Sequence, residues 1–560
     1  MTTLIDNIRK GVIGARQPLT TAFGEKPLVY ADYTASGRGL DIIESYIREQ
    51  VLPWYANTHT ETSFTGAQTT ALREQARQQI RSAVGGSAED QVIFCGPGAT
   101  AAINKLIDML NLRLPRDLAD RYALEALIPA EERPVVFIGP YEHHSNELPW
   151  RESIADVVAI PLTDSGQIDV DALEEALCAY TSRPVLIGSF SAGSNVTGVK
   201  SDVAAVTAVL KRHGALAFWD YAAAAPYVGI DVNGEVPVDA VFISPHKFVG
   251  GPGTPGVLVV KRSILENTVP AVVGGGTVVY VTPEDHMFIE DHERREEGGT
   301  PAIVESIRAG LVFKLQQEVG TDEIERREHD YVQRAIARLE ACENVEILGN
   351  LAAPRLSIMS LRFKHGDKDL HYGFVVSLLN DLFGIQVRGG CSCAGPYGHS
   401  LLGMNMDYSR ALESEICRGN MVLRPGWVRL NFNYFIDEEE FEYLVSAIEL
   451  TAEHGWRMLP YYKFDAGAGV WRYQGRGVQL EADLDDWRFA DPASWRVAGA
   501  RERLPLLGYA EAAASELLRP KPEAERFTLS LPPRCEKLRW FVLPQEIELP
   551  VAGAAKAVTT

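Results

Sequence analysis

The amino-acid sequence predicts an α/β fold in which helices cover a mostly parallel, seven-stranded sheet. Short apolar runs alternate with amphipathic stretches from about residue 28 to residue 305, and this alternation is typical of parallel sheets. Helical patterns between the runs include residues 99–110, 169–179 and 202–212. Ligands bind at the carboxyl ends of the strands in such sheets, so we expect the functional residues there. The strand candidates are residues 92–95, 135–138, 157–160, 185–189, 216–220, 240–244 and 257–260.

The sequence before and after this large domain (28–305) predicts three further regions. An N-terminal arm (1–27) precedes it, and a smaller α+β domain (306–455) follows it. The smaller domain opens with one long helical pattern at 304–338. Its further elements are strand candidates at 356–363 and 427–431 and helical patterns at 371–382 and 438–453.

A C-terminal extension (456–560) differs in composition from the rest of the chain and contains no catalytic motif or internal repeat. We expect it to pack against the main body, with its last ten or so residues disordered. Its tryptophans, which lie among Gly, Asp and Arg, are Trp456, Trp471, Trp487 and Trp495.

Charge and composition exclude several classes of partner. The formal net charge is -21 and the sequence pI is about 5.1, so nucleic acid and anionic membrane surfaces would be repelled. No apolar run reaches the roughly 18 residues of a membrane span, and the first ten residues lack the pattern of a signal peptide. Seven scattered cysteines are not a disulfide framework. We therefore expect a cytoplasmic enzyme.

Lys247 is the most informative residue of the chain. It follows the apolar run 241–244 and precedes a glycine-rich turn, with Ser244 and His246 beside it. A lysine amine held at a strand end can condense with an aldehyde to form a Schiff base, which is how enzymes anchor pyridoxal 5'-phosphate. For this lysine alone, a surface position after a strand is the alternative interpretation.

Other residues predict the remaining parts of a pyridoxal phosphate site. The cofactor needs an acid beside its pyridine nitrogen, a stacking group and an anion site. Asp220 ends the strand candidate 216–220, and His143 follows the strand candidate 135–138. The turn at 96–100 precedes a helix, whose free N–H groups and positive end suit a phosphate.

The order of these motifs resembles the class V aminotransferase superfamily and, within it, the cysteine desulfurase and selenocysteine lyase group, which have the pyridoxal phosphate type I fold. The resemblance covers about residues 28 to 455 and leaves the C-terminal extension outside. The matching segments are 30–36, 98–100, 142–146 with Pro149 and Trp150, 194–198, Asp220, 244–247, 274–276, 299–301, 388–393 and 428–430.

The resemblance implies a role for each matched residue. Lys247 would bind the cofactor covalently and then transfer protons, Asp220 would face the pyridine nitrogen, and His143 would stack on the ring. The substrate carboxylate would be bound by Asn195, Arg429 and Arg388, since a planar guanidinium can grip a carboxylate through two hydrogen bonds; surface arginines are the alternative. The phosphate would be held by Ala99, Thr100, Ser244 and His246, joined by Thr300 from the second subunit of a homodimer.

Two cysteines one residue apart carry the sulfur chemistry that the resemblance implies. Cys393 falls where desulfurases keep the cysteine that attacks the substrate sulfur and becomes a persulfide, and nearby positive charge from Arg388 would favour its thiolate. Cys391 replaces a residue that is usually histidine. Together they look more like the desulfurase domain of molybdenum cofactor sulfurases, whose second domain is larger than this extension. Both cysteines could instead fill a turn, and they are too few for a zinc site, so we expect no metal.

One departure concerns the cofactor's phenolic oxygen. Many desulfurases place a glutamine three residues after the aspartate, where this chain has Ala223. Another donor, such as Tyr221 or a water, must substitute for it, or the chemistry differs. Ala99 likewise stands where threonine or serine is common.

The sequence thus predicts a homodimeric enzyme that removes sulfur or selenium from a cysteine-like amino acid, leaves alanine, and passes the sulfur to an acceptor protein. Transamination, β-elimination from a C–S bond and epimerisation are alternatives that need Lys247 but not Cys393. A non-catalytic sulfur carrier of the same fold is the alternative from a different functional class.

Overall fold

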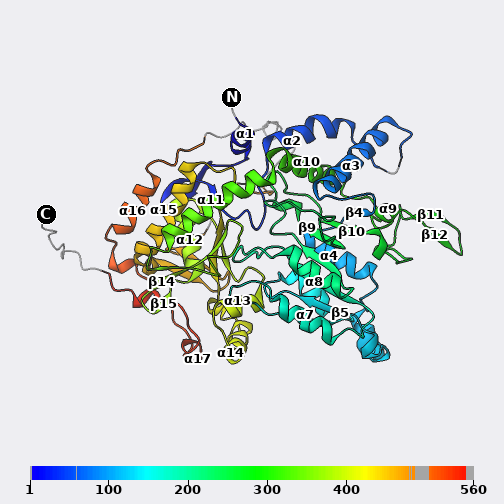
Figure 1. The fold of residues 1–560 in the computed structure, drawn as a ribbon. Coiled ribbons are helices and arrows are strands. Elements are labelled where there is room, and N and C mark those ends of the chain that lie inside the picture. Colours follow the sequence, from blue (N-terminus) through cyan, green and yellow to red (C-terminus); the bar gives the residue numbers. More distant parts are fainter. Residues whose placement is uncertain (1–2, 59, 478–479, 481, 486–502, 550–560) are drawn as a thin grey trace.

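A seven-stranded sheet forms the core of the larger region, on the right in Figure 1. The structure is a computed structural model, and it describes residues 3–58, 60–477, 480, 482–485 and 503–549. The strand order is β4-β10-β9-β8-β7-β5-β6; β10 is antiparallel to both of its neighbours, and the other pairs are parallel. The predicted mostly parallel sheet is therefore confirmed. Its strands are β4 (Asp90–Phe94), β5 (Val135–Ile138), β6 (Asp156–Ala159), β7 (Leu186–Ser191), β8 (Leu216–Asp220), β9 (Ala240–Ile243) and β10 (Val257–Lys261).

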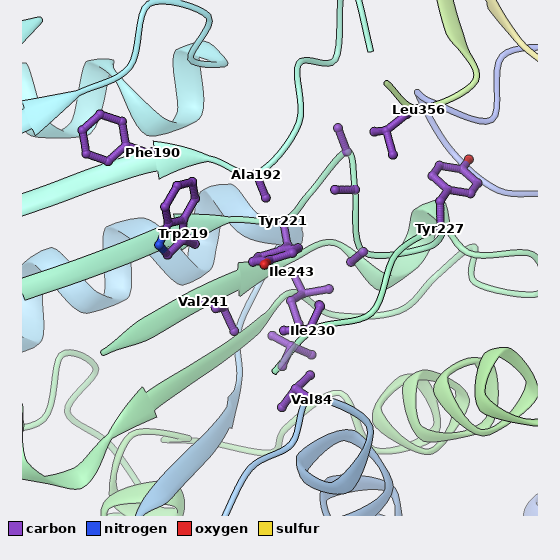
Figure 2. Close-up of a cluster of buried hydrophobic side chains, with 14 of the residues drawn as sticks. Val84, Phe190, Ala192, Trp219, Tyr221, Tyr227, Ile230, Val241, Ile243 and Leu356 are labelled. Carbon is purple, nitrogen blue, oxygen red and sulfur yellow. The ribbon is translucent and has the colours of Figure 1, made fainter. Parts of the chain in front are cut away.

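Alternate residues of these strands fill two apolar cores, one on each face of the sheet. Trp219 and Val241 belong to one core, shown in Figure 2, whereas Phe218 and Phe242 belong to the other. Side chains alternate across a strand, and both faces are covered, so the strands read as continuous apolar runs. The helices of this region are α2 (Asp41–Tyr46), α3 (Phe64–Ala83), α4 (Gly98–Met109), α5 (Arg116–Tyr122), α6 (Leu148–Arg151), α7 (Val170–Ala179), α8 (Val203–Arg212) and α9 (His292–Arg295).

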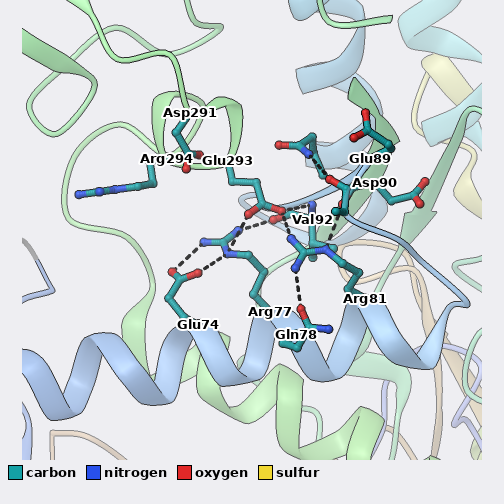
Figure 3. Close-up of polar contacts among 12 residues, drawn as sticks. Glu74, Arg77, Gln78, Arg81, Glu89, Asp90, Val92, Asp291, Glu293 and Arg294 are labelled. Carbon is teal, nitrogen blue, oxygen red and sulfur yellow. Dashed lines mark hydrogen bonds and ion pairs between the residues drawn. The ribbon is translucent and has the colours of Figure 1, made fainter. Parts of the chain in front are cut away.

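Side chains, rather than another strand, bind the open edge of the sheet at β4 (Figure 3). The N–H of Val92 donates to Glu293 Oε1 (2.6 Å), and the N–H of Phe94 donates to Glu297 Oε1 (2.7 Å). The guanidinium of Arg77 donates to the Val92 carbonyl and also pairs with Glu297 (3.0 Å). An unpaired edge strand can template aggregation; here side chains of α3, of α9 and of Glu297 just after it bond to the polar groups of the edge.

A second, antiparallel sheet with the order β13-β14-β18-β17 lies in the smaller region. The predicted single helical pattern at 304–338 is wrong, because Gly320 adopts a φ of 87° and separates two helices. The elements are α10 (Ile303–Val319), α11 (Thr321–Leu339), β13 (Val345–Ile347), β14 (Ile358–His365), β15 (Lys368–Asp369), α12 (Tyr372–Phe383), β17 (Arg388–Gly390), α13 (Gly395–Leu401), α14 (Met406–Cys417), β18 (Trp427–Asn431) and α15 (Glu438–His454).

The described part of the C-terminal extension packs against α12, as expected. The indole N–H of Trp471 donates to Nδ1 of His371 (3.1 Å), and Trp540 stacks on the same imidazole. Trp471 and Phe541 are buried in the apolar core of the smaller region. Trp487, Trp495 and the last ten residues lie outside the described residues. The extension's elements are β19 (Tyr462–Asp465), β20 (Val470–Tyr473), α16 (Tyr509–Leu518) and α17 (Pro533–Glu536).

The remaining elements belong to the N-terminal segment and to a hairpin. The short strand β3 pairs in parallel with β16, which links the start of the chain to the smaller region. No helix among the described residues is long and apolar enough to span a bilayer. The elements are α1 (Leu4–Gly11), β1 (Pro18–Thr21), β2 (Gly24–Pro27), β3 (Val29–Tyr30), β16 (Ile385–Gln386) and the hairpin strands β11 (Val278–Val281) and β12 (His286–Phe288).

The ion-pair network beside β4 generates a stability prediction. Glu297→Ala removes a buried carboxylate that pairs with both Arg73 and Arg77 and should lower the free energy of unfolding by about 3 kcal/mol or more. The control is Glu74→Ala, whose half-exposed carboxylate pairs with Arg77, and which should cost less than about 1 kcal/mol. Urea unfolding followed by circular dichroism measures both, and equal losses would contradict the prediction.

Candidate active site

A cavity of about 420 Å³ lies at the carboxyl ends of the sheet strands. Part of its wall follows or ends β4, β5, β7, β8 and β9, which is where ligands bind in sheets of this kind. The rest of the wall comes from residues 34–35, from Thr254 and from the segment containing β17 and β18. The structure brings nearly all of the predicted site residues into its wall. These are Ala99, Thr100, His143, Asn195, Asp220, Ser244, His246, Lys247, Arg388, Cys393 and Arg429.

Lys247 stands on a single 3-10 turn directly after β9. Burial lowers the pKa of its amine to about 8; Asp220 raises this pKa, whereas the guanidinium groups of Arg429 and Arg388 lower it. A lysine with such a pKa carries a substantial neutral fraction near neutral pH, and the neutral amine is the nucleophile and the base.

Asp220 is the last residue of β8 and lies beside Lys247. Its side chain is buried, and Oδ1 accepts a hydrogen bond from the N–H of Ala222 (2.8 Å). Burial raises the pKa of this carboxyl, whereas the Ala222 N–H and the charge of Lys247 lower it. A buried carboxylate of this kind needs a positive partner, and the cavity offers one.

The two histidines of the cavity are neutral. Burial, followed by the charge of Lys247, lowers the pKa of His143 to about 3 and that of His246 to about 4. His143 Nδ1 accepts a hydrogen bond from the N–H of Ser145 (3.1 Å). The ring proton therefore lies on Nε2, and the imidazole adds no charge to the cavity.

The turn between β4 and α4 forms a small polar cradle. Gly98 has a φ of 56°, and a Cβ there would lie 2.9 Å from Ser244 Oγ, so the close approach requires glycine. The N–H of Ala99 donates to Ser244 Oγ (2.8 Å), and Thr100 Oγ1 lies 2.6 Å from Ser145 Oγ. Hydroxyl groups and the N-terminus of a twelve-residue helix together suit a phosphate.

Two arginines line the opposite part of the cavity, and both contact an acid to which the sequence analysis gave no role. Arg388 and Arg429 face each other across the β17–β18 pair. Asp32 accepts from Arg388 Nε (3.1 Å) and from Arg429 Nη2 (3.0 Å). Arg429 Nη1 also donates to the carbonyl of Asn195 (3.1 Å). The signal available in the sequence was an acid within the matching motif at 30–36.

Cys393 reaches the cavity from a strained turn. Ser392 and Cys393 adopt φ values of 55° and 57°, a conformation that non-glycine residues rarely adopt. Hydrogen bonds to other segments hold the turn: Asn195 Nδ2 to the Ser392 carbonyl (2.8 Å), the His144 N–H to the Cys393 carbonyl (2.8 Å), the Gly395 N–H to His144 Nε2 (3.0 Å) and Trp427 Nε1 to Ser392 Oγ (3.2 Å). The Cys393 side chain is exposed, and it alone of the cysteine pair lines the cavity.

Glu142 is a second residue whose position the sequence analysis did not interpret. Its buried carboxylate accepts from the N–H and Oγ of Ser191 (2.8 and 2.6 Å) and from Asn146 Nδ2 (2.6 Å). Burial raises its pKa to about 7. Glu142 therefore ties the turn that carries His143 to the end of β7.

Two residues to which the sequence analysis gave a role at the cofactor, Tyr221 and Thr300, do not line this cavity. Ala223 lines the wall, but Tyr221, the suggested substitute donor, does not line it and packs in the apolar core (Figure 2). Thr300 is exposed and lies away from the cavity, with Asn57 Nδ2 3.4 Å from its Oγ1. Its predicted contribution to a second subunit's site stays a prediction.

Known proteins share this chain's sequence pattern. A family model described as aminotransferase class-V matches residues 29–444. The chain belongs to the aminotransferase class-V family. Among its relatives, a probable cysteine desulfurase from Halalkalibacterium halodurans is 30% identical over 378 residues, which cover 66% of this chain and 85% of that protein. Another, from Halobacterium salinarum, is 26% identical over 430 residues, covering 76% and 92%.

Solved structures share the fold of this class-V protein. A cysteine desulfurase from Thermococcus onnurineus, 24% identical, covers 76% of this chain and 95% of its own with a TM-score of 0.63. One from Escherichia coli, 21% identical, covers 76% and 94% with a TM-score of 0.60. The predicted resemblance is thus confirmed. This family depends on pyridoxal phosphate, and the chain is accordingly a pyridoxal phosphate-dependent enzyme.

The pKa of Lys247 generates a prediction for cofactor uptake by this class-V enzyme. Only the neutral amine attacks an aldehyde, so the rate at which the apoprotein incorporates pyridoxal phosphate covalently should rise with pH and reach half its maximum near pH 8. Lys247→Arg should abolish the covalent incorporation. Stopped-flow absorbance measures the rate; a half-maximum near 10.5, the ordinary lysine value, would contradict the burial argument.

Proposed function

We propose that the protein is a cysteine desulfurase, which takes sulfur from L-cysteine, leaves alanine, and carries the sulfur as a persulfide on Cys393. The observation that carries this proposal is that the Cys393 thiol and the Lys247 amine line one cavity. A reaction that needs only a lysine would not require an exposed thiol on a turn that hydrogen bonds hold at the cavity. The relatives named probable cysteine desulfurases support the same reaction.

The residues of the cavity fit pyridoxal 5'-phosphate. Asp220 would hold a proton on the pyridine nitrogen, Lys247 would bind the aldehyde carbon, and the neutral ring of His143 would face the cofactor ring. The cradle of Gly98, Ala99, Thr100, Ser244 and His246 would hold the phosphate. When bound, the cofactor supplies an electron sink for the substrate Cα.

Arg429 and Arg388 would bind the α-carboxylate of the substrate, which directs the substrate sulfur toward Cys393. Lys247 would remove the Cα proton, because its lowered pKa makes the amine a useful base. The Cys393 thiolate would then form an S–S bond as the substrate Cβ–S bond breaks. The electron pair of that bond remains with the substrate carbons, and protonation there yields alanine.

The exposure of Cys393 suits transfer of the sulfur to an acceptor protein. Asn195, predicted as a carboxylate ligand, already uses one amide hydrogen to hold the Ser392 carbonyl, so we assign it a positioning role as well. All seven cysteines are unpaired, which supports a reducing compartment such as the cytoplasm.

A second copy of the chain would complete the assembly that we propose. The β11–β12 hairpin projects from the body (Figure 1), and its apolar side chains are exposed: Tyr280 by 68%, Val279 and Met287 by 60% each. Exposed apolar patches of this kind mark interaction sites. The nearby Thr300 would then reach the phosphate of the partner's site.

A second candidate function is another class-V reaction, such as β-elimination from a C–S bond, transamination or epimerisation. The small side chain of Ala223 in the cavity wall favours it, since no glutamine is available there to hydrogen-bond the cofactor's phenolic oxygen. Those reactions need Lys247 but not a thiol at position 393.

Replacement of each cysteine separates the two candidates. Cys393→Ala removes the thiol that accepts the sulfur. It should reduce alanine and sulfide formation from L-cysteine by roughly 100-fold or more, as expected when a nucleophile is removed. The matched control is Cys391→Ala, which removes a thiol outside the cavity and should retain activity within about threefold. Cofactor absorbance should be unchanged in both variants.

The products formed from L-cysteine and the presence of a persulfide on Cys393 distinguish the desulfurase from the other class-V reactions. Mass spectrometry of the wild-type protein after turnover should place an added sulfur of 32 Da, the mass of one sulfur atom, on the peptide containing Cys393. Full activity in Cys393→Ala, with pyruvate or another keto acid as product, would overturn the desulfurase proposal in favour of the second candidate.

A further inference from the structure

Asp32 already accepts hydrogen bonds from Arg388 and Arg429, the two arginines that we propose bind the substrate carboxylate. Its two carboxylate oxygens accept separately, Oδ1 from Arg429 and Oδ2 from Arg388, at 3.0 and 3.1 Å. Arg429 is buried, with its side chain 4% exposed, whereas the side chain of Arg388 is 54% exposed. One arginine is therefore fixed by burial, and the other can move between Asp32 and a ligand.

The charges at this end of the cavity can be counted. Over the part of the chain that the structure describes, Asp32 is the one acid within ion-pair distance of either arginine. His143 is neutral and adds nothing to the count. Lys247 and Asp220, the other charged residues of the cavity wall, balance each other. Two guanidinium charges and one carboxylate charge then leave a single positive charge for a ligand, which is one α-carboxylate.

We propose that Asp32 limits this end of the cavity to one anionic group and thereby selects amino acids with a single carboxylate over dicarboxylic amino acids. The inference rests on the proposed function in that Arg429 and Arg388 bind the substrate carboxylate. A second carboxylate on the ligand would enter a partly desolvated cavity without a free guanidinium, and an unpaired charge is costly there. Asp32 is thus a specificity-determining residue that acts through the arginines.

L-Aspartate and L-asparagine are suitable probes, because they have nearly the same shape and differ by one negative charge. Calorimetric titration of the wild-type holoenzyme should give a dissociation constant at least tenfold larger for L-aspartate than for L-asparagine. Equal constants in the wild type would overturn the inference whether or not any variant folds.

The isosteric variant Asp32→Asn frees one guanidinium charge for the ligand. In Asp32→Asn, the dissociation constants for L-aspartate and L-asparagine should lie within about threefold of each other. Most of the roughly tenfold preference for L-asparagine would then be lost. Adding Arg388→Gln to this variant returns the charge count to one and should restore the preference for L-asparagine. The control Asp41→Asn replaces an exposed acid at the start of α2 and should behave as the wild type.

A merely structural role for Asp32 would weaken binding of both probes equally and would not be rescued by Arg388→Gln. That outcome, or an unchanged ratio in a folded Asp32→Asn variant, would overturn the inference. Its failure is distinguishable from failure of the proposed function, because the titrations need no sulfur release. A shifted ratio in a protein that forms no sulfide from L-cysteine would support the charge rule and refute the desulfurase reaction.

Discussion

The site depends on a lysine amine placed beside a buried carboxylate at the ends of two adjacent parallel strands. β8 ends at Asp220, and β9 is followed by Lys247 on a tight turn. The buried carboxylate of Asp220 would be costly without this positive partner. Because the strands run in parallel, the turns after β4, β5 and β7 open on the same side and complete the cavity around this pair.

Segments far apart in the sequence supply the opposite wall. The antiparallel register of β17 and β18 places Arg388 opposite Arg429, and Asp32 comes to both from the N-terminal segment, which the β3–β16 pair fixes to the smaller region. The Cys393 turn is bonded to Asn195 and His144, which belong to the large sheet region. The proposed nucleophile is thus positioned by both parts of the chain.

Elements with a clear local pattern, such as the strands of the large sheet, were predicted from the sequence. Features that depend on contacts between distant segments were missed. The seven strands of the large sheet were found because continuous apolar runs mark strands buried on both faces. β17 was missed because Arg388-Gly-Gly is too short and polar to show a pattern. The break at Gly320 was missed because a single glycine inside a helical pattern does not by itself mark a helix end. The contacts of Asp32 with Arg388 and Arg429 join residues 356 and 397 positions apart, and no local rule predicts them. The role proposed for Thr300 would depend on a second copy of the chain, which no local pattern can place.

The central claim is that the amine at position 247 holds the cofactor, and one measurement tests it directly. Borohydride reduction of the holoprotein, followed by digestion and mass spectrometry, should place a single pyridoxal phosphate adduct on Lys247. An adduct on a different lysine, or a protein that acquires none after incubation with the cofactor, would contradict the account.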